Sequence, residues 1–253
     1  MSTIQGTSVL FWHDLRLTLR NPVWMLFAIA QPLVFLVFFG PLVTRTLGAS
    51  GLSSHNAWQT FVPGVLLQLS LFGAAFTGFT VITDLQSGVL ERLRVTPVSR
   101  TALLLGRVLR DVVILLFQAI VLLLIAIPFG LRADAAEILI SLAFVALIGL
   151  SLASLSSALG LMLKTEESLG PLFNTVLLPL LLLSGALLPM SLAPGWLNGI
   201  SRVTPFRYVL EAVRSTLQGH FAAVVVAEGA AVAVGMFLLA MFCGIRVYMR
   251  QGA

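Results

Sequence analysis

The side chains best suited to chemistry lie in one charged block between two long apolar runs. This block, Asp84 to Arg100, reads DLQSGVLERLRVTPVSR. Gly88 lets the chain turn, and Val89 to Val95 can form about one or two helical turns before Thr96-Pro97 ends them. We expect a short surface helix with one apolar and one charged side, formed by Gly88, Val89, Leu90, Glu91, Arg92, Leu93 and Arg94. Such a helix could insert into a groove of a partner protein, or the block could be a basic turn that binds anionic lipid headgroups.

Other reactive residue types are too few or too scattered for an enzyme active site. The single cysteine, Cys243, cannot form an internal disulfide or a thiolate metal site. The only lysine, Lys164, follows Leu163, whereas a phosphate-binding P-loop needs Gly-Lys-Ser or Gly-Lys-Thr. The three histidines lie outside the apolar runs, at His13, His55 and His220. We therefore expect no enzyme activity and no metal site or cofactor in this chain, and any ATP that drives it must be bound by another chain.

Composition places these residues in a membrane. Hydrophobic residues make up 58% of the 253 residues, charged residues only 10%, and the mean hydropathy is +1.04. A soluble domain of this composition could not cover its surface with polar groups, and a membrane-crossing helix needs about 20 apolar residues. We expect an all-α integral membrane protein, with one transmembrane domain over residues 1–253. Its six transmembrane helices are expected at about 22–44, 61–83, 102–129, 138–163, 172–190 and 221–245.

Two further helical segments are expected outside these spans. Within residues 1–21, the apolar side chains of Ser8 to Arg20 gather on one helical face, which is typical of a helix lying on a membrane surface. Residues 192–218 are too polar for a span. There, Pro194-Gly195-Trp196 indicates a turn into a short helix, and Thr204-Pro205 indicates an N-cap followed by a first-turn proline. We expect a re-entrant hairpin of two short helices that dips into the outer leaflet.

The distribution of basic residues predicts the orientation. Six spans put both termini on one side, and that side carries ten of the fifteen Arg and Lys residues. Because cytoplasmic loops are enriched in basic residues, we expect both termini and the block at 84–100 in the cytoplasm, and the hairpin at 192–218 outside. The net charge of +5 then reflects topology, and we expect no nucleic-acid partner.

Polar side chains inside the apolar runs are the candidates for lining a transport path. They are Gln68, Thr77, Gln118, Ser154, Asn174, Ser184 and Glu228. Each could instead only hydrogen-bond or pack between helices. Glu228 is the one acidic residue clearly inside a span, which makes it a functional candidate by default. It lies about two turns from the outer end of its span, so it could make an interfacial ion pair, line the path or relay a proton.

Two stretches carry a resemblance to a known family. The first, Gly88 to Arg107, reads GVLERLRVTPVSRTALLLGR. The second, Leu177 to Arg214, reads LLPLLLLSGALLPMSLAPGWLNGISRVTPFRYVLEAVR. Both are similar to the permease subunits of type-2 ABC exporters, particularly the daunorubicin-resistance type. Within the second stretch, the residues of the expected hairpin are Pro194, Gly195, Trp196, Pro205, Phe206, Tyr208 and Arg214.

The resemblance implies a half-transporter in a bacterial cytoplasmic membrane. Two permease chains, more often identical than not, would pair and sit on two ATPase subunits that bind ATP and Mg²⁺. Residues 88–95 would be the coupling helix, 8–20 the interfacial helix, and 192–217 the external hairpin. The expected activity is export of a hydrophobic or amphipathic compound such as an antibiotic. The alternatives are a permease for a lipid-linked polysaccharide or other glycolipid and, more remotely, an ATP-independent channel or a membrane enzyme.

Overall fold

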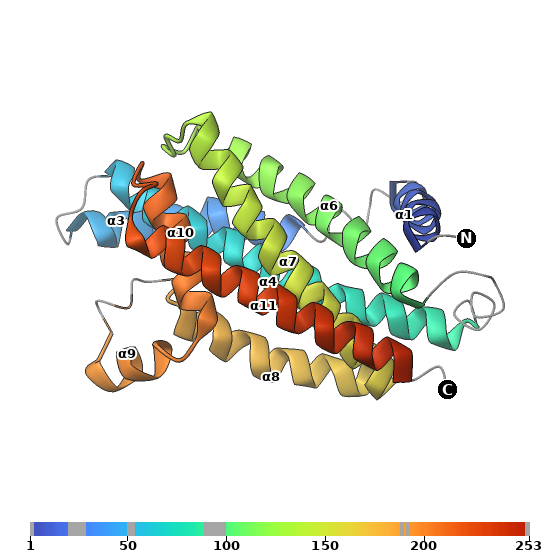
Figure 1. The fold of residues 1–253 in the computed structure, drawn as a ribbon. Helices are drawn as coiled ribbons and strands as arrows, with labels where there is room; N and C mark the ends of the chain where they lie inside the picture. Colours follow the sequence, from blue (N-terminus) through green and yellow to red (C-terminus); the bar gives the residue numbers. More distant parts are fainter. Residues whose placement is uncertain are drawn as a thin grey trace.

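Long helices form here because an apolar environment forces backbone N–H and C=O groups to bond within their own segment. The computed structural model describes residues 3–19, 29–49, 54–88, 100–187, 190 and 193–250. Five long helices run side by side in this part of the chain (Figure 1). They are α4 (Ser54–Gln86), α6 (Arg100–Ala126), α7 (Ala135–Leu163), α8 (Glu166–Ser184) and α11 (Val224–Arg250).

These five helices are each long and apolar enough to cross a membrane. The described part of the expected first span is α-helical over 29–34, continues as the π-helix η1 (Phe35–Phe39), and ends in α3 (Gly40–Ala49). Its apolar portion, Ile29–Val43, is shorter than a full span. Residues 20–28 lie outside the described residues, so the span expected at 22–44 stays a prediction, and with it the total of six spans.

Local capping sets helix ends that hydropathy alone does not predict. At the start of α7, the Asp134 backbone N–H donates to Glu137 Oε2 over 3.0 Å, within a capping box. Helix α8 runs over 166–184, whereas we expected a span over 172–190. Two glutamates in its first turn suit the positive end of the helix dipole, and Gly185 ends it in the left-handed conformation at φ +79°. Helix α11 likewise continues to Arg250, beyond the expected end at 245.

Helix α4 occupies the centre of the bundle. Within an apolar stretch of 18 residues, 72% of the residues of α4 are buried, against 22% in α8 and 17% in α11. It packs along α7 and also contacts α6, α8 and α10. Glycines allow this close packing, because a methyl group on Gly160 would lie 2.5 Å from the Gly78 carbonyl oxygen. The outer faces of α8 and α11 keep many exposed apolar side chains.

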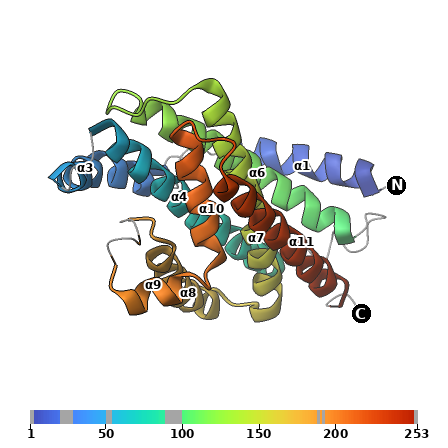
Figure 2. The same ribbon diagram turned by 60° about the vertical axis from the view of Figure 1, so that its left-hand side comes forward.

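The shorter helices mark the two ends of the bundle. Helix α1 (Thr3–Leu19) lies against α6, at the same end as the last turn of α11 (Figures 1 and 2). Helices α9 (Gly195–Ser201) and α10 (Pro205–Leu217) lie at the opposite end. Pro194 precedes α9, and Thr204 precedes α10 with Pro205 in its first turn, which confirms the helix starts predicted for the hairpin. Helix α10 buries a whole face against α4, α7, α8 and α11.

Candidate functional site

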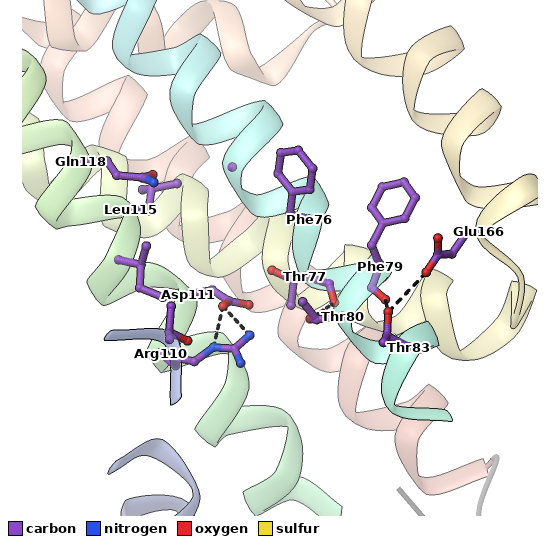
Figure 3. A pocket seen from close by; sticks show the side chains of 13 residues that line it. Phe76, Thr77, Phe79, Thr80, Thr83, Arg110, Asp111, Leu115, Gln118 and Glu166 are labelled. Carbon is purple, nitrogen blue, oxygen red and sulfur yellow. Dashed lines mark hydrogen bonds and ion pairs between the residues drawn. The ribbon is translucent and has the colours of Figure 1, made fainter. Parts of the chain in front are cut away.

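A cavity of about 510 Å³ lies between α1, α4, α6 and the start of α8, in the half of the bundle nearest α1. Helix α4 contributes residues at three- and four-residue steps, which places them on one face, and a face of α6 lies opposite (Figure 3). The lining residues are Thr18, Gly73, Phe76, Thr77, Phe79, Thr80, Thr83, Arg110, Asp111, Ile114, Leu115, Gln118 and Glu166. The cavity brings together two residues predicted for the path, Thr77 and Gln118.

The polar atoms of this cavity differ in how fully they are bonded. The Thr80 hydroxyl donates to the Thr77 carbonyl over 2.8 Å. The Thr83 hydroxyl lies 3.0 Å from the Phe79 carbonyl and 3.3 Å from Glu166 Oε1. By contrast, Thr77 Oγ1 and Asp111 Oδ2 are buried with no hydrogen-bond partner among the described residues. An unpaired buried oxygen costs free energy, so a ligand that bonds these atoms would gain by doing so.

One wall of the cavity is aromatic. The rings of Phe76 and Phe79 have centroids 6.2 Å apart, and Phe79 is in turn 6.0 Å from the ring of Phe173 on α8. These distances are typical of aromatic pairs, which present flat apolar faces. The cavity therefore combines an aromatic wall on α4 with charged and amide groups on α6.

Ion pairs gather at the same end of the bundle. Arg110 Nε donates to Asp111 Oδ1 over 2.8 Å, and Arg110 Nη1 lies 3.9 Å from Asp14 Oδ2 on α1. Deeper in the fold, Arg107 Nη2 pairs with Asp84 Oδ2 at 2.5 Å, and the Arg107 side chain is only 5% exposed. These contacts tie the last turns of α4 and the helix α1 to the first turns of α6.

The Asp84–Arg107 pair joins the two helices that flank the segment predicted to couple to a partner. Helix α4 ends at Gln86, and Gly88 turns away from it at a left-handed φ of +71° that favours glycine. Helix α6 begins at Arg100. The predicted coupling residues Val89, Leu90, Glu91, Arg92, Leu93 and Arg94 lie outside the described residues.

At the opposite end, Arg214 on α10 bonds to two backbone carbonyls from distant parts of the chain. Its Nε donates to Thr60 of α4 over 3.0 Å, and its Nη2 donates to Gly185 over 2.7 Å. The Gly185 carbonyl follows the end of α8, where helix carbonyls lack partners within the helix. Burial lowers the pKa of Arg214 to about 10, with Glu211 opposing the shift, so the guanidinium stays charged at neutral pH.

Arg207 and Tyr208 hold the hairpin together. Arg207 Nη1 donates to Asn198 Oδ1 over 2.6 Å and to Ser201 Oγ over 2.5 Å, both on α9, while its Nε donates to Glu211 over 2.8 Å. The Tyr208 hydroxyl donates to the Arg202 carbonyl over 2.9 Å. Phe206 is buried against the bundle, whereas Trp196 on α9 is 69% exposed.

The other predicted path residues do not gather at the cavity. Gln68 is buried in α4 outside the cavity lining. The hydroxyls of Ser154 and Ser184 donate to carbonyls of their own helices, at Leu150 and Leu181. Asn174 and Glu228 are exposed on α8 and α11.

Several cavity residues were not predicted from the sequence. Thr80 and Thr83 follow the predicted Thr77 at three-residue steps, and this spacing would have placed three hydroxyls on one helical face. Arg110 and Asp111 are visible in the sequence as charges near the start of a span. Nothing in the sequence indicates that they face α4. Among the described residues, no three His, Cys, Asp or Glu side chains gather as a metal site would require.

Comparison with known proteins identifies the class to which this arrangement belongs. Residues 5–217 match the model of the ABC-2 type transporter family, and the chain belongs to that family. The match includes the cavity helices α4 and α6, the segment between them, and the hairpin that carries Arg214. With its five span-length helices, the chain is a multi-pass membrane permease of an ABC transporter.

Individual relatives agree with this assignment. The daunorubicin resistance ABC transporter permease protein DrrB1 of Streptomyces coeruleorubidus is 27% identical over 220 residues, which is 86% of this chain and 77% of that protein. The ycf38 transport permease of Cyanophora paradoxa is 29% identical over 197 residues, or 77% of this chain and 68% of that protein. The doxorubicin resistance permease DrrC of Mycobacterium tuberculosis is 24% identical over 202 residues, covering 79% and 72%.

Proposed function

We propose that this chain is the permease subunit of an ATP-driven exporter that moves a hydrophobic or amphipathic compound out of the cytoplasm. The family match over residues 5–217 carries the proposal. The relatives named for resistance to daunorubicin and doxorubicin support an antibiotic-like cargo. The cavity also supports it, because about 510 Å³ lies within the usual range for small-molecule pockets and is far too small for a polysaccharide.

Energy would enter through residues 88–95. In the proposed assembly, two ATPase subunits bind ATP and Mg²⁺, and each presents a groove to the coupling segment of one permease chain. The Asp84–Arg107 pair supports this role, because it fixes the ends of α4 and α6 to each other where the segment leaves and rejoins the bundle. Helix α1 packs against α6 beside this point and would add to the contact. ATP can drive the change only if the two states of the assembly bind it with different affinity.

The proposed orientation places α1, the cavity and both termini on the cytoplasmic side, in a bacterial plasma membrane. Its support is the excess of Arg and Lys at that end of the bundle, together with the position of α1 and the end of α11 at one end (Figure 1). The first span would extend over 22–44, which gives six spans. A second copy of this chain would complete the pathway, and the exposed apolar faces of α8 and α11 leave area for such a contact.

Co-purification and transport test this function. We expect the tagged chain, co-expressed with its partner ABC ATPase, to co-purify with that ATPase in equal amounts. In inside-out vesicles the complex should accumulate an aromatic antibiotic when ATP is added, and a variant ATPase that binds but does not hydrolyse ATP should abolish uptake. A chain that transports alone in liposomes without ATP would contradict the proposal.

A further inference from the structure

Three buried polar side chains lie beside the Asp84–Arg107 pair. They are Arg107 of α6, Ser157 of α7 and Tyr248 of α11, which are 5%, 0% and 6% exposed. The Tyr248 hydroxyl lies close to both Arg107 and Ser157. Arg107 Nη1, Ser157 Oγ and the Tyr248 hydroxyl are nevertheless each buried with no hydrogen-bond partner among the described residues. Unpaired buried polar atoms cost free energy, so the cluster disfavours the arrangement of helices seen here.

The three groups are complementary as donors and acceptors. A guanidinium only donates hydrogen bonds, whereas a serine or tyrosine hydroxyl both donates and accepts. Arg107 Nη1 can therefore donate to the Tyr248 hydroxyl, and that hydroxyl can donate to Ser157 Oγ. The guanidinium is held in place for this, because its other terminal nitrogen, Nη2, pairs with Asp84 Oδ2 at 2.5 Å. A small displacement of α11 would complete a chain of bonds from α4 through α6 and α11 to α7.

Helix α11 packs closely against α6 and α7 near this point. Gly244 lies four residues before Tyr248 and therefore on the same helical face. A methyl group on Gly244 would lie 3.3 Å from the Leu104 side chain of α6 and 3.4 Å from the Ser154 carbonyl oxygen of α7. The buried side chains that pack with Tyr248 are mostly apolar and come from α4, α6 and α7. Apolar packing has no directional requirement, so α11 can slide by a small distance along this face.

The cluster lies where residues 88–95 leave and rejoin the bundle. Asp84 is near the end of α4 and Arg107 is near the start of α6, so a push on that segment displaces both residues relative to α11. The cavity of about 510 Å³ in the half of the bundle nearest α1 suits the state in which an exporter receives its cargo. The missing bonds would then form when ATP drives the assembly into its other state.

We propose that Tyr248 is a positioning residue for ATP-driven transport, whose hydroxyl joins Arg107 to Ser157 in the ATP-bound state of the assembly only. These bonds stabilise that state relative to the arrangement seen here. The inference rests on the proposed export function and deepens it. It gives a role to α11, which follows the residues 5–217 that match the family model.

The affinity of the assembly for ATP tests the inference, because ATP binds to the partner ATPase and not to Tyr248. The sample is the purified complex with an ATPase variant that binds but does not hydrolyse ATP. Tyr248→Phe removes only the hydroxyl, and by linkage it should weaken ATP binding about fivefold, the effect expected of one lost hydrogen bond. The melting temperature without nucleotide should stay unchanged or rise, because the hydroxyl is unbonded in the state seen here.

Tyr208→Phe is the matched control, since Tyr208 and Tyr248 are the two tyrosines of the chain. The Tyr208 hydroxyl donates to the Arg202 carbonyl at the hairpin end, so its loss should leave ATP affinity unchanged. If Tyr248→Phe does not assemble, Ser157→Ala should weaken ATP binding by a similar factor and decides the question.

Three results would overturn the inference. They are unchanged ATP affinity in Tyr248→Phe, an equal loss of affinity in Tyr208→Phe, and a lower melting temperature of Tyr248→Phe without nucleotide. The last result would mean that the hydroxyl is bonded in both states. Failure of the unaltered chain to form a complex with the ATPase would instead contradict the proposed function itself.

Discussion

The two ends of the bundle are held together by different kinds of contact. At the hairpin end, Arg214 bonds backbone carbonyls of Thr60 and Gly185, and Arg207 bonds α9 to α10. At the α1 end, carboxylates pair with Arg107 and Arg110 beside a cavity that contains unbonded oxygens. The contacts at the first end include bonds to backbone carbonyls, whereas those at the second are ion pairs between side chains.

This difference fits a molecule in which one end moves more than the other. Backbone carbonyls at helix ends cannot shift without disturbing the helices themselves, so the contacts of Arg214 favour a single arrangement. Ion pairs between side chains can rearrange with a small change of helix position. We infer that the hairpin end moves less than the α1 end when the permease changes conformation.

The largest effect is expected from filling the closest contact at the hairpin end. A methyl group on Gly64 would lie 1.9 Å from the carbonyl oxygen of Ala186, which belongs to the backbone rather than to a flexible side chain. Gly64→Ala should lower the free energy of unfolding by about 3 kcal/mol, seen as a lower melting temperature of the purified protein. Gly235→Ala on α11 is the control, because no atom lies within 4 Å of its added methyl group, and it should leave stability unchanged or raise it by up to about 1 kcal/mol. Equal melting temperatures for the two variants would mean that this end is not closely packed.

A smaller effect is expected from the ion pair between Asp84 and Arg107 at the α1 end. Asp84→Asn leaves the buried guanidinium of Arg107 without its charged partner and should cost about 2 kcal/mol of stability, since Asp84 itself is 34% exposed. The double variant with Arg107→Gln should be less destabilised than the sum of the two single variants. The matched pair at the hairpin end, Arg207 and Glu211, should show coupling of only about 0.5 kcal/mol in the same double-mutant cycle. Additive effects at Asp84 and Arg107 would show that the pair does not join α4 to α6.

The smallest effect concerns the side of α4 that faces away from the cavity. The Ser156 hydroxyl on α7 accepts from the Gly78 N–H over 2.8 Å and donates to the Ala75 carbonyl over 2.7 Å, so it bonds α4 to α7. Ser156→Ala should lower the free energy of unfolding by about 1 kcal/mol. Ser154→Ala should have almost no effect, because its hydroxyl donates only to Leu150 of its own helix. If both substitutions cost the same, the bond between α4 and α7 contributes nothing of its own.

Sequence patterns predicted the features that depend on local chemistry. Thr204-Pro205 starts a helix because an extended residue followed by proline suits the first turn, and the structure confirms it. Hydropathy also predicted several long apolar helices, and five helices of the described residues are long and apolar enough to span a membrane. The shift of α8 to 166–184 was not predicted, because charges at its start and a left-handed glycine at its end outweigh hydropathy.

The cavity depends on contacts between distant residues, which one sequence does not reveal. Thr77 and Gln118 were predicted as polar residues within spans, yet only the packing of α4 against α6 places them together. The same criterion selected Asn174 and Glu228, which lie on exposed faces of this chain. Arg214 was identified by family resemblance, but its partners lie 154 and 29 residues away in the chain.

Replacing the charges of the coupling segment tests the central claim most directly. The claim is that ATP hydrolysis in a partner drives this permease through residues 88–95 at its cytoplasmic end. A double variant in which Glu91 and Arg92 are both replaced by glutamine is made in the co-expressed complex. It should abolish ATP-dependent uptake into inside-out vesicles, while membrane insertion and melting temperature stay unchanged. ATP-dependent uptake at the wild-type rate in that double variant would contradict the account.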